Sequence, residues 1–335
     1  MSAAARSGVL LMTYGSPATL EREDIRTYLA AVRGGREPDA ELVDEFTRRY
    51  QVIGGSPLIP ITGRQAAALE RRTGRPAEVG MRFSEPSIAT GLERLTERGA
   101  DEVVAIILSP QYSPLLMRGY EDALRRAVAG LGARAPRVRV ADPWFLEPAF
   151  VAALADRIRA AIGRLPAADQ PGVRVLLTAH SLPRTVADRE PDYLAQLRDT
   201  AEAVARAAAI PAERWTFCWQ SAGHEPGEWM KPDFADLMPD IGRSTTPAVV
   251  VAPIQFLADH LEVLYDVDVG AREQAEANAV RFERIASLND DPGLIEALAA
   301  LAGRRGGTAI ESSAQASSMP GAASNASVAA SARPS

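Results

Sequence analysis

Residues 174–183 have the sequence RVLLTAHSLP, and this stretch decides the fold class. Its apolar run is typical of a strand that is buried on both faces of a parallel sheet. Amphipathic stretches with helical spacing lie on either side of it, at 148–163 and 192–209. A buried strand between two helices is the repeating unit of an α/β protein, so the sequence predicts βαβ units.

The same alternation extends in both directions along the chain. Further strands are predicted at 9–14, 78–83, 102–109, 138–142, 215–219 and 248–254, and further helices at 39–50, 63–72, 87–97 and 121–130. Four predicted strands precede residue 144 and three follow residue 172, so the pattern runs twice. We therefore expect two Rossmann-like, doubly wound domains, at 1–147 and 148–268, with a ligand cleft between them.

The C-terminal part of the chain has a different character. Helical segments are predicted from 269 to about 284 and from 292 to 302, and the second could pack back on the first domain. Residues 303–335 are rich in Ala, Ser and Gly and contain almost no large apolar side chains. Such a segment cannot bury enough surface to offset its ordering entropy, so we predict a disordered tail without catalytic residues.

Composition excludes several classes of protein. The formal net charge of -6 and the absence of a basic stripe argue against nucleic-acid binding. The single cysteine, Cys218, excludes an intrachain disulfide, a Cys-only zinc site and a four-Cys iron–sulfur cluster. No apolar run approaches the ~20 residues that span a bilayer, and the N-terminal GVLLM is too short for a signal peptide. We expect a soluble cytoplasmic protein that uses no organic cofactor. No GxGxxG opens a helix after the first strand, which weakens a dinucleotide-binding interpretation.

Polar side chains follow two of the predicted strands, where ligands bind in open α/β sheets. Tyr14 comes after an apolar strand, and its phenol could bind a metal or simply cap the sheet edge. His180 ends the strand quoted above and is followed by Pro183, which stops regular structure. An imidazole can accept a proton or ligate a metal, but a structural, hydrogen-bonded histidine is an equal alternative.

Two further segments could contribute chemistry. The stretch 252–266, APIQFLADHLEVLYD, begins at a strand end, and if it continues as an α-helix Asp259, Glu262 and Asp266 share one face. Glu273 extends that line, which suggests cation binding or merely a solvated face. In 217–229, FCWQSAGHEPGEW, aromatic residues flank a Gly/Pro-rich loop that suits a flat apolar ligand, although Trp219 could equally be core. His224 in this loop is interpreted as a surface residue and Cys218 as a buried strand residue.

Taken together, these segments resemble the ferrochelatase family, and most closely its coproporphyrin branch. The resemblance covers residues 8–302 and rests on motifs in the family's order and spacing: LLMTYGSP, YQVIGGSPL, SPQYSPLLMRGY, TAHSLP, WQSAGHEPGEWMKPD and ADHLEVLYDVD. TAHSLP followed by DHLEVLY is the most specific pair. One departure is a shorter glycine loop, in which Gly55 directly precedes Ser56. Tyr14, the WQSAGHEP loop, the lack of iron–sulfur cysteines and the lack of a membrane-binding extension favour the coproporphyrin branch.

The resemblance implies an activity and a set of site residues. It implies insertion of Fe²⁺ into a porphyrin, with His180 and Glu262 as the catalytic pair and the ligands of the incoming iron. Tyr14 corresponds to a tyrosine that ligates the metal of the bound porphyrin. Asp266 and Glu273 correspond to an acidic ridge for a second, hydrated cation such as Mg²⁺. The positions that contact the porphyrin and its propionates correspond to Tyr14, Arg33, Arg49, Tyr50, Ser56 and Tyr120.

The sequence therefore predicts a ferrochelatase, a lyase of haem biosynthesis that converts coproporphyrin III to Fe-coproporphyrin. Protoporphyrin IX is the alternative substrate. A cobalt or nickel chelatase is a less favoured alternative because the three histidines are scattered, and a non-catalytic haem- or metal-binding protein is another. The expected partners are the porphyrin and Fe²⁺, together with transient contacts to neighbouring haem-pathway enzymes. The expected chain has neither a transmembrane segment nor an affinity for nucleic acid.

Overall fold

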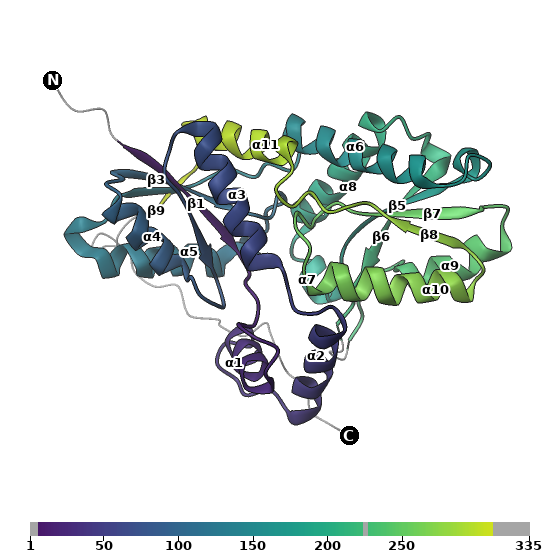
Figure 1. Cartoon of the computed structure of the whole chain (residues 1–335), viewed down its shortest axis with the longest axis horizontal. Helices are drawn as coiled ribbons and strands as arrows, with labels where there is room; N and C mark the ends of the chain where they lie inside the picture. Colours follow the sequence, from purple (N-terminus) through teal and green to yellow (C-terminus); the bar gives the residue numbers. More distant parts are fainter. Residues whose placement is uncertain (1–5, 224–226, 311–335) are drawn as a thin grey trace. The chain divides into compact units, whose positions relative to one another are not determined.

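The computed structural model describes residues 6–223 and 227–310. Within them the chain forms two compact units. Unit 1 contains residues 6–108, 114–143 and 298–310, and unit 2 contains residues 109–113, 144–223 and 227–297. Each unit is built on a mainly parallel sheet with helices on both faces (Figure 1), which confirms the predicted α/β class with two parallel-sheet domains. The domain boundaries at 147, 268 and 302 stay a prediction.

The sheet of unit 1 has the strand order β2-β1-β3-β4-β9. Its strands are β1 (Ser7–Thr13), β2 (Ala77–Met81), β3 (Glu102–Ile107), β4 (Arg137–Val140) and β9 (Thr308–Ile310). β1 is central and parallel to both neighbours, with Leu11 opposite Val79 on one side and Ile106 on the other. Because helices cover both faces, Val9–Met12 are completely buried, as the continuous apolar run predicts.

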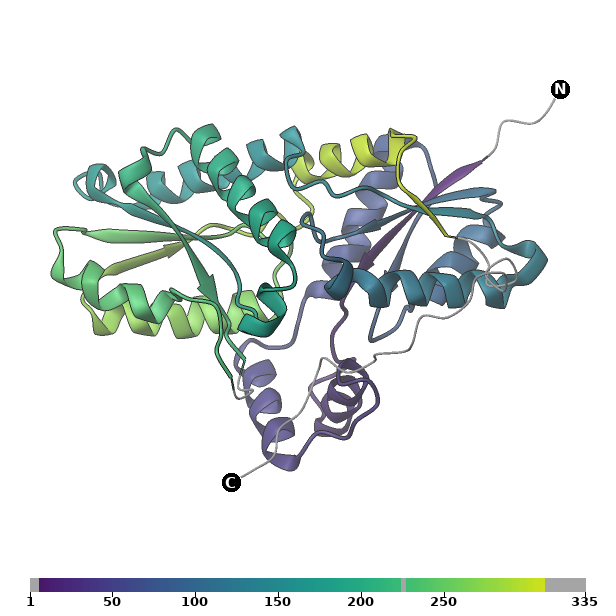
Figure 2. The same cartoon turned by 180° about the vertical axis from the view of Figure 1, so that it is seen from behind.

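The helices that lie wholly in the described part of unit 1 are α1 (Arg22–Val32), α2 (Ala40–Val52), α3 (Leu58–Thr73), α4 (Ile88–Glu97) and α5 (Pro114–Leu131). A short 3₁₀ turn, η1 (Gly132–Arg134), follows α5. α3 covers one face of the sheet, whereas α4 and α5 cover the other (Figures 1 and 2). α1 and α2 contact each other and stand apart from the sheet, so their side chains are positioned by the loops after β1 and α1.

The sheet of unit 2 has the order β6-β5-β7-β8, and all its pairs are parallel. Its strands are β5 (Arg174–His180), β6 (Trp215–Gln220), β7 (Ala248–Pro253) and β8 (Arg281–Arg284). Its helical elements are α6 (Pro148–Arg164), η2 (Gln170–Gly172), α7 (Arg184–Ala187), α8 (Pro191–Ala207), η3 (Ala212–Arg214), α9 (Phe234–Arg243), the π-helix η4 (Glu262–Ala271) and α10 (Arg272–Ala277). α11 (Pro292–Gly303) belongs to unit 2 up to residue 297 and to unit 1 from residue 298.

Helices sandwich the sheet of unit 2. α6 and α8 cover one face, and α9, η4 and α10 cover the other (Figure 1). A buried cluster under the second group joins Leu176 and Val251 of the sheet to Met238 of α9 and Val267 of η4. The apolar contacts of this cluster hold the π-helix against the strands that carry the candidate site.

Two parts of the C-terminal prediction are wrong. Arg281–Arg284, expected to end a helix, forms the edge strand β8, and Thr308–Ile310, expected to be disordered, pairs antiparallel with β4 as β9. Both strands are short and lie at sheet edges, where pairing with the neighbouring strand overrides weak local preference. The rest of the predicted tail, residues 311–335, lies outside the described residues.

Candidate functional site

His180 is the last residue of β5 and is held by two hydrogen bonds. Its backbone N–H donates to Oε1 of Gln255 at 2.8 Å. Its ring Nδ1 lies 2.5 Å from the carbonyl oxygen of Ser181. Because a carbonyl only accepts, Nδ1 carries the proton, and the lone pair of the neutral ring is on Nε2. The strand therefore ends in an imidazole with a fixed tautomer and a side chain that is 30% exposed.

Glu262 is the first residue of the π-helix, and its carboxylate meets His180. Oε2 of Glu262 lies 3.8 Å from Nε2 of His180. The two residues come from different elements, 82 positions apart in the sequence, and each presents an electron-pair donor to the same space. The structure thus brings together the two residues that the sequence predicts as catalytic.

A second histidine, His260, completes this group. Its Nδ1 lies 2.9 Å from the carbonyl oxygen of Ala258, so here too Nδ1 donates and Nε2 is left facing the site. Nε2 of His260 is 3.7 Å from the same Oε2 of Glu262, and the Phe256 ring packs edge-on against the imidazole at 4.6 Å. Sequence analysis did not select His260. Its position two residues before Glu262 in the most specific motif was the available signal.

The charges of this group depend on one another. Burial by itself would raise the pKa of Glu262, but the charge of His180 and the hydrogen bond and charge of His260 outweigh it and lower that pKa to about 2. Burial would likewise lower the pKa of His260, but the hydrogen bond and charge of Glu262 raise it. The carboxylate is therefore ionised at neutral pH, and the group attracts a cation, either a proton on an imidazole or a metal ion.

Uncharged residues hold the end of strand β5, and with it His180, in place. Gln255, which holds the backbone of His180, donates through Nε2 to the hydroxyl of Tyr193, a fully buried residue of α8. In the same strand as His180, Thr178 of β5 donates to the side-chain oxygen of Gln220 at the end of the neighbouring strand, β6. Sequence analysis missed these supporting residues, because the contacts join segments 42 to 75 positions apart. A polar residue at the end of a buried strand was the only local signal.

The predicted row of carboxylates on one α-helical face is wrong. Asp259 precedes the helix and turns to Ser287 and Asn289, which donate to its oxygens at 2.7 and 2.9 Å. Residues 262–271 form a π-helix, whose wider turn does not follow the 3.6-residue spacing used for the prediction. Asp266 lies on this π-helix and Glu273 is exposed on α10. In the part of the chain that the structure describes, no group of three or more His, Cys, Asp or Glu is arranged to hold a metal ion.

Tyr14 and Tyr120 lie in unit 1. Tyr14 directly follows β1 and is 40% exposed, with its ring edge-on to Phe83 at 4.6 Å. The turn is tight, because Gly15 has φ +104° and a Cβ there would lie 2.3 Å from Oγ of Ser84. Tyr120 is buried in α5, and burial raises the pKa of its phenol, so it is a neutral hydrogen-bonding group.

The remaining predicted residues surround the helical pair α1 and α2. Arg33 ends α1, and its buried Nε has no hydrogen-bond partner in the described part of the chain. Arg49 of α2 is bound to Glu45 at 2.7 Å, while Tyr50 is 4% exposed. Ser56 accepts from the backbone N–H of Leu58 at 3.4 Å, at the start of α3. Arg33 is thus a cationic donor with an unused N–H.

The loop after β6 was the remaining candidate segment. Trp219 is 4% exposed, which confirms the core alternative rather than a ligand-facing ring. Cys218 is completely buried, as predicted, and burial raises the pKa of its thiol to about 12. His224 lies outside the described residues.

Comparison with known proteins decides the family. Residues 6–305 match the model of the Ferrochelatase family. The chain belongs to the ferrochelatase family. It is thus a porphyrin metal chelatase, a lyase, with Fe²⁺ as a substrate, and it is an enzyme of haem biosynthesis. In the described residues, no helix is both long and apolar enough to span a bilayer.

Relatives of this ferrochelatase cover nearly its whole length. Coproporphyrin III ferrochelatase of Geobacillus kaustophilus is 35% identical, with 89% of this chain and 96% of the relative aligned. Ferrochelatase of Deinococcus radiodurans is also 35% identical, with 89% and 95% aligned. Among solved structures, SirB from Bacillus subtilis with Fe³⁺ superposes with a TM-score of 0.56 at 13% identity, covering 88% of this chain and 94% of SirB, which supports the fold.

Proposed function

We propose that this ferrochelatase inserts Fe²⁺ into coproporphyrin III, giving Fe-coproporphyrin, and that His180 and Glu262 receive the metal. The observation that carries the metal site is the 3.8 Å approach of Nε2 of His180 to Oε2 of Glu262. Support for the coproporphyrin branch comes from relatives that are named coproporphyrin III ferrochelatases and are 35% and 34% identical over 89% of this chain.

The donor atoms suit a metal that must be handed over. Nε2 of His180 offers a lone pair because Nδ1 is committed to a backbone carbonyl, and the pKa of Glu262 is lowered to about 2, which keeps its oxygens ionised. Imidazole and carboxylate ligands suit Fe²⁺, although Zn²⁺, Co²⁺ and Cu²⁺ compete for such a pair. In this proposal two protein ligands hold the iron, and water and the porphyrin nitrogens complete its coordination.

As the metal enters the porphyrin, protons leave it for the protein. Metal insertion joins Fe²⁺ to four pyrrole nitrogens and releases two N–H protons, so the overall charge is balanced. When the metal leaves the protein, the lone pairs of His180 and His260 again face the carboxylate of Glu262. These imidazoles are the groups that can accept the two protons, and Glu262 stabilises the charge that they gain.

Other side chains would hold the porphyrin and its metal. Coproporphyrin III carries four carboxylates, and Arg offers a planar fork of donors that matches a carboxylate. Arg33, with its unused Nε–H, is the best-supported propionate ligand. The further propionate and macrocycle contacts that we propose are Arg49, Tyr50, Ser56 and Tyr120, and we propose Tyr14 as the axial ligand of the porphyrin metal. The exposure of Tyr14 at a strand end supports that role.

A second cation is a weaker part of the proposal. Asp266 and Glu273 are carboxylates on consecutive helical segments, and Mg²⁺ is commonly held by one or two carboxylates together with water. Within the described residues no third His, Cys, Asp or Glu joins them. They therefore do not form a protein cage, and no step of the reaction is assigned to this ion.

We also propose a cytoplasmic location and transient contacts with neighbouring haem-pathway enzymes.

The metal site is tested by His180→Ala and Glu262→Gln in an anaerobic assay that follows conversion of the porphyrin spectrum. Removal of either ligand should lower kcat/KM for Fe²⁺ by ~10²-fold or more, as expected for loss of a positioned ligand and proton acceptor. Glu276→Gln, which removes an exposed carboxylate of α10 that has no role in the proposed site, is the matched control for charge. Near-normal turnover by a folded His180→Ala protein would refute the assignment.

The substrate is tested with the unmodified enzyme. Initial rates with coproporphyrin III should exceed those with protoporphyrin IX, and Arg33→Met should reduce the difference by raising KM for coproporphyrin III. A clear preference for protoporphyrin IX would refute the assignment to the coproporphyrin branch. Insertion of cobalt or nickel in preference to iron would refute Fe²⁺ as the metal substrate.

A further inference from the structure

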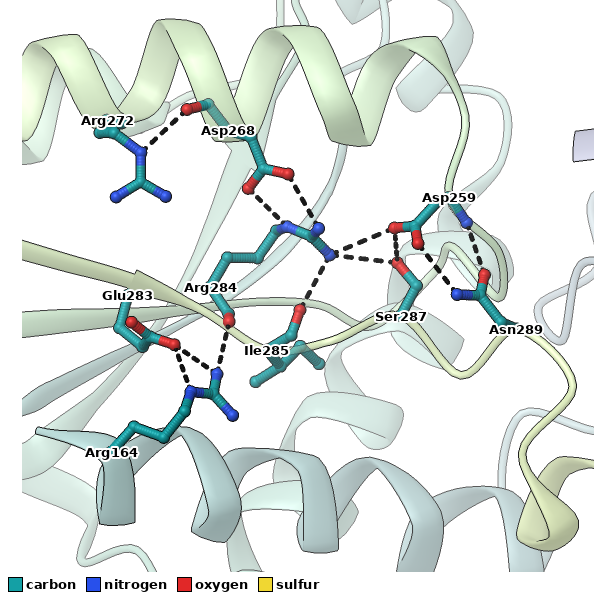
Figure 3. Close-up of polar contacts among 9 residues, drawn as sticks. All are labelled: Arg164, Asp259, Asp268, Arg272, Glu283, Arg284, Ile285, Ser287 and Asn289. Atoms are coloured by element: carbon teal, nitrogen blue, oxygen red, sulfur yellow. Dashed lines mark hydrogen bonds and ion pairs between the residues drawn. The ribbon is translucent and has the colours of Figure 1, made fainter. Parts of the chain in front are cut away.

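Arg284 connects the two ends of the segment that carries Glu262. It is the last residue of β8, and its side chain is only 13% exposed. Figure 3 shows its guanidinium between two carboxylates, Asp268 on the π-helix and Asp259 in the turn before His260. Arg284 was not selected from the sequence. Its side-chain partners among the described residues are Asp268, Asp259, Ser287 and the carbonyl oxygen of Ile285, and they include neither His180 nor Glu262.

The contact with Asp268 is a two-point ion pair. Nε donates to one carboxylate oxygen at 2.7 Å and Nη2 donates to the other at 2.8 Å. This fork-to-fork geometry fixes direction as well as distance, which a single charged contact does not. Arg284 thereby fixes the middle of the π-helix against the edge of the sheet.

The third nitrogen of Arg284 faces the other end of the segment. Nη1 lies 3.4 Å from Oδ1 of Asp259 and donates to the carbonyl oxygen of Ile285 at 2.9 Å and to Oγ of Ser287 at 3.2 Å. Ser287 in turn donates to Asp259 at 2.7 Å. Asn289 closes the arrangement, because its side chain accepts from the backbone N–H of Asp259 and donates to Oδ2, both at 2.9 Å (Figure 3).

These contacts bracket the metal site along the chain. Asp259 lies three residues before Glu262, and Asp268 lies six residues after it, so one guanidinium holds both flanks. A π-helix is a rare conformation that is seldom stable on hydrogen bonding alone and is frequent at functional sites. A residue that holds both flanks can therefore set where the first turn, and with it the carboxylate of Glu262, stands relative to His180.

We propose that Arg284 is a positioning residue for metal transfer, acting through Asp259 and Asp268 to place Glu262 against His180. This inference rests on the proposed role of Glu262 as a ligand of the incoming iron. Arg284 is shared between two partly buried carboxylates, so losing the guanidinium leaves both of them without their cation. The π-helix then shifts away from the strand, and the 3.8 Å approach of Glu262 to His180 is lost.

The test compares Arg284→Met and Arg284→Lys with Arg164→Met. Arg164 is the matched control because it also binds strand β8, donating to Glu283 at 2.7 Å and to the carbonyl oxygen of Arg284 at 3.1 Å, but none of its contacts reaches the π-helix (Figure 3). Kinetics are measured per folded protein, with the folded fraction taken from circular dichroism below the melting transition. Arg284→Lys keeps the positive charge and guards against a variant that fails to fold.

We expect Arg284→Met to raise KM for Fe²⁺ and lower kcat, with a combined loss of ~10²-fold, the scale expected for a misplacement of about 1 Å. The dissociation constant for coproporphyrin III should be unchanged. Arg284→Lys should show a smaller loss of the same kind, because one ammonium cannot reproduce the fork. Arg164→Met should lower thermal stability without changing KM for Fe²⁺ or kcat.

A double-mutant cycle separates the inference from the function on which it rests. In the Glu262→Gln background, Arg284→Met should have little further effect on KM for Fe²⁺, since the group that it positions is already lost. If Glu262→Gln alone behaves as wild type, the proposed metal site is wrong. If Glu262→Gln is impaired but the Arg284 variants differ from wild type only in stability, as Arg164→Met does, the positioning role is wrong.

Discussion

Replacing Tyr193 by Phe tests whether a buried hydroxyl contributes to the placement of His180. Tyr193 is 1% exposed, and its hydroxyl accepts a hydrogen bond from Nε2 of Gln255. Oε1 of the same amide accepts the backbone N–H of His180 at 2.8 Å. Burial raises the pKa of Tyr193, so the hydroxyl is neutral and the substitution removes one polar atom without removing a charge.

The loss in free energy of unfolding follows from the hydrogen-bonding groups that the substitution leaves unpaired. The ring of Tyr193 remains, so its apolar contacts are unchanged, and one hydrogen bond with a net value of about 1 kcal/mol is lost. The amide N–H of Gln255 is left without its acceptor, which raises the cost further. The total stays at about 2 kcal/mol or less, because Gln255 is only half-buried and water can reach part of it. We expect the free energy of unfolding to fall by about 1–2 kcal/mol.

The effect on activity should be smaller than that of removing a ligand. With its amide free to rotate, Gln255 holds the backbone of His180 less firmly, and kcat/KM for Fe²⁺ should fall by less than about tenfold, equivalent to about 1.4 kcal/mol. Urea unfolding and anaerobic insertion kinetics measure the two quantities. In a Gln255→Leu background, Tyr193→Phe should have almost no additional effect on kinetics. An undiminished effect there would refute a connection through Gln255.

Two further predictions concern the turn at Tyr14 and the proton on His260 at the proposed metal site. Gly15→Ala should lower the free energy of unfolding, measured in urea, by about 2–4 kcal/mol, because Gly15 has a φ of +104° and the new Cβ would displace the Ser84 hydroxyl. Gly35→Ala is the control: its φ is +89° but no atom lies near the new Cβ, so it should cost only about 1–2 kcal/mol. Equal losses of stability in the two variants would contradict the predicted clash with Ser84. Because Glu262 raises the pKa of His260, the stabilisation from that proton is complete below the ordinary value of 6.5 and is lost as pH rises through the raised pKa. Glu262→Gln should abolish this dependence in unfolding titrations across that range, and an unchanged profile would mean that the two side chains do not interact.

The strands were predictable because their signal is local. Buried parallel strands need continuous apolar runs, and β5 was predicted at its observed bounds from that pattern alone. The missed elements lack such a signal. β8 has the sequence RFER, with charged residues typical of an edge strand, and α9 carries an internal proline, Pro239, which argues against a helix in any pattern-based prediction.

The site was only partly predictable. His180 and Glu262 were found because their motifs resemble those of a family, whereas position alone left each with an ordinary structural alternative. Gln255 and Arg284 were missed for a physical reason: each acts on residues that are distant in the sequence or belong to a differently spaced helix. No periodicity in one segment indicates which side chain of another segment will pair with it.

The π-helix explains why the prediction for Asp259 was wrong. A 3.6-residue repeat predicts that Asp259 and Glu262 share a face, but the helix starts only at Glu262 and turns more widely. Asp259 is consequently free to bind Ser287 and Asn289, and Arg284 joins it to Asp268. The carboxylate that the α-helical pattern assigned to the cation row instead helps to hold the chain that presents Glu262. In the proposed site, an acidic residue of the motif would therefore contribute through an arginine rather than through the metal.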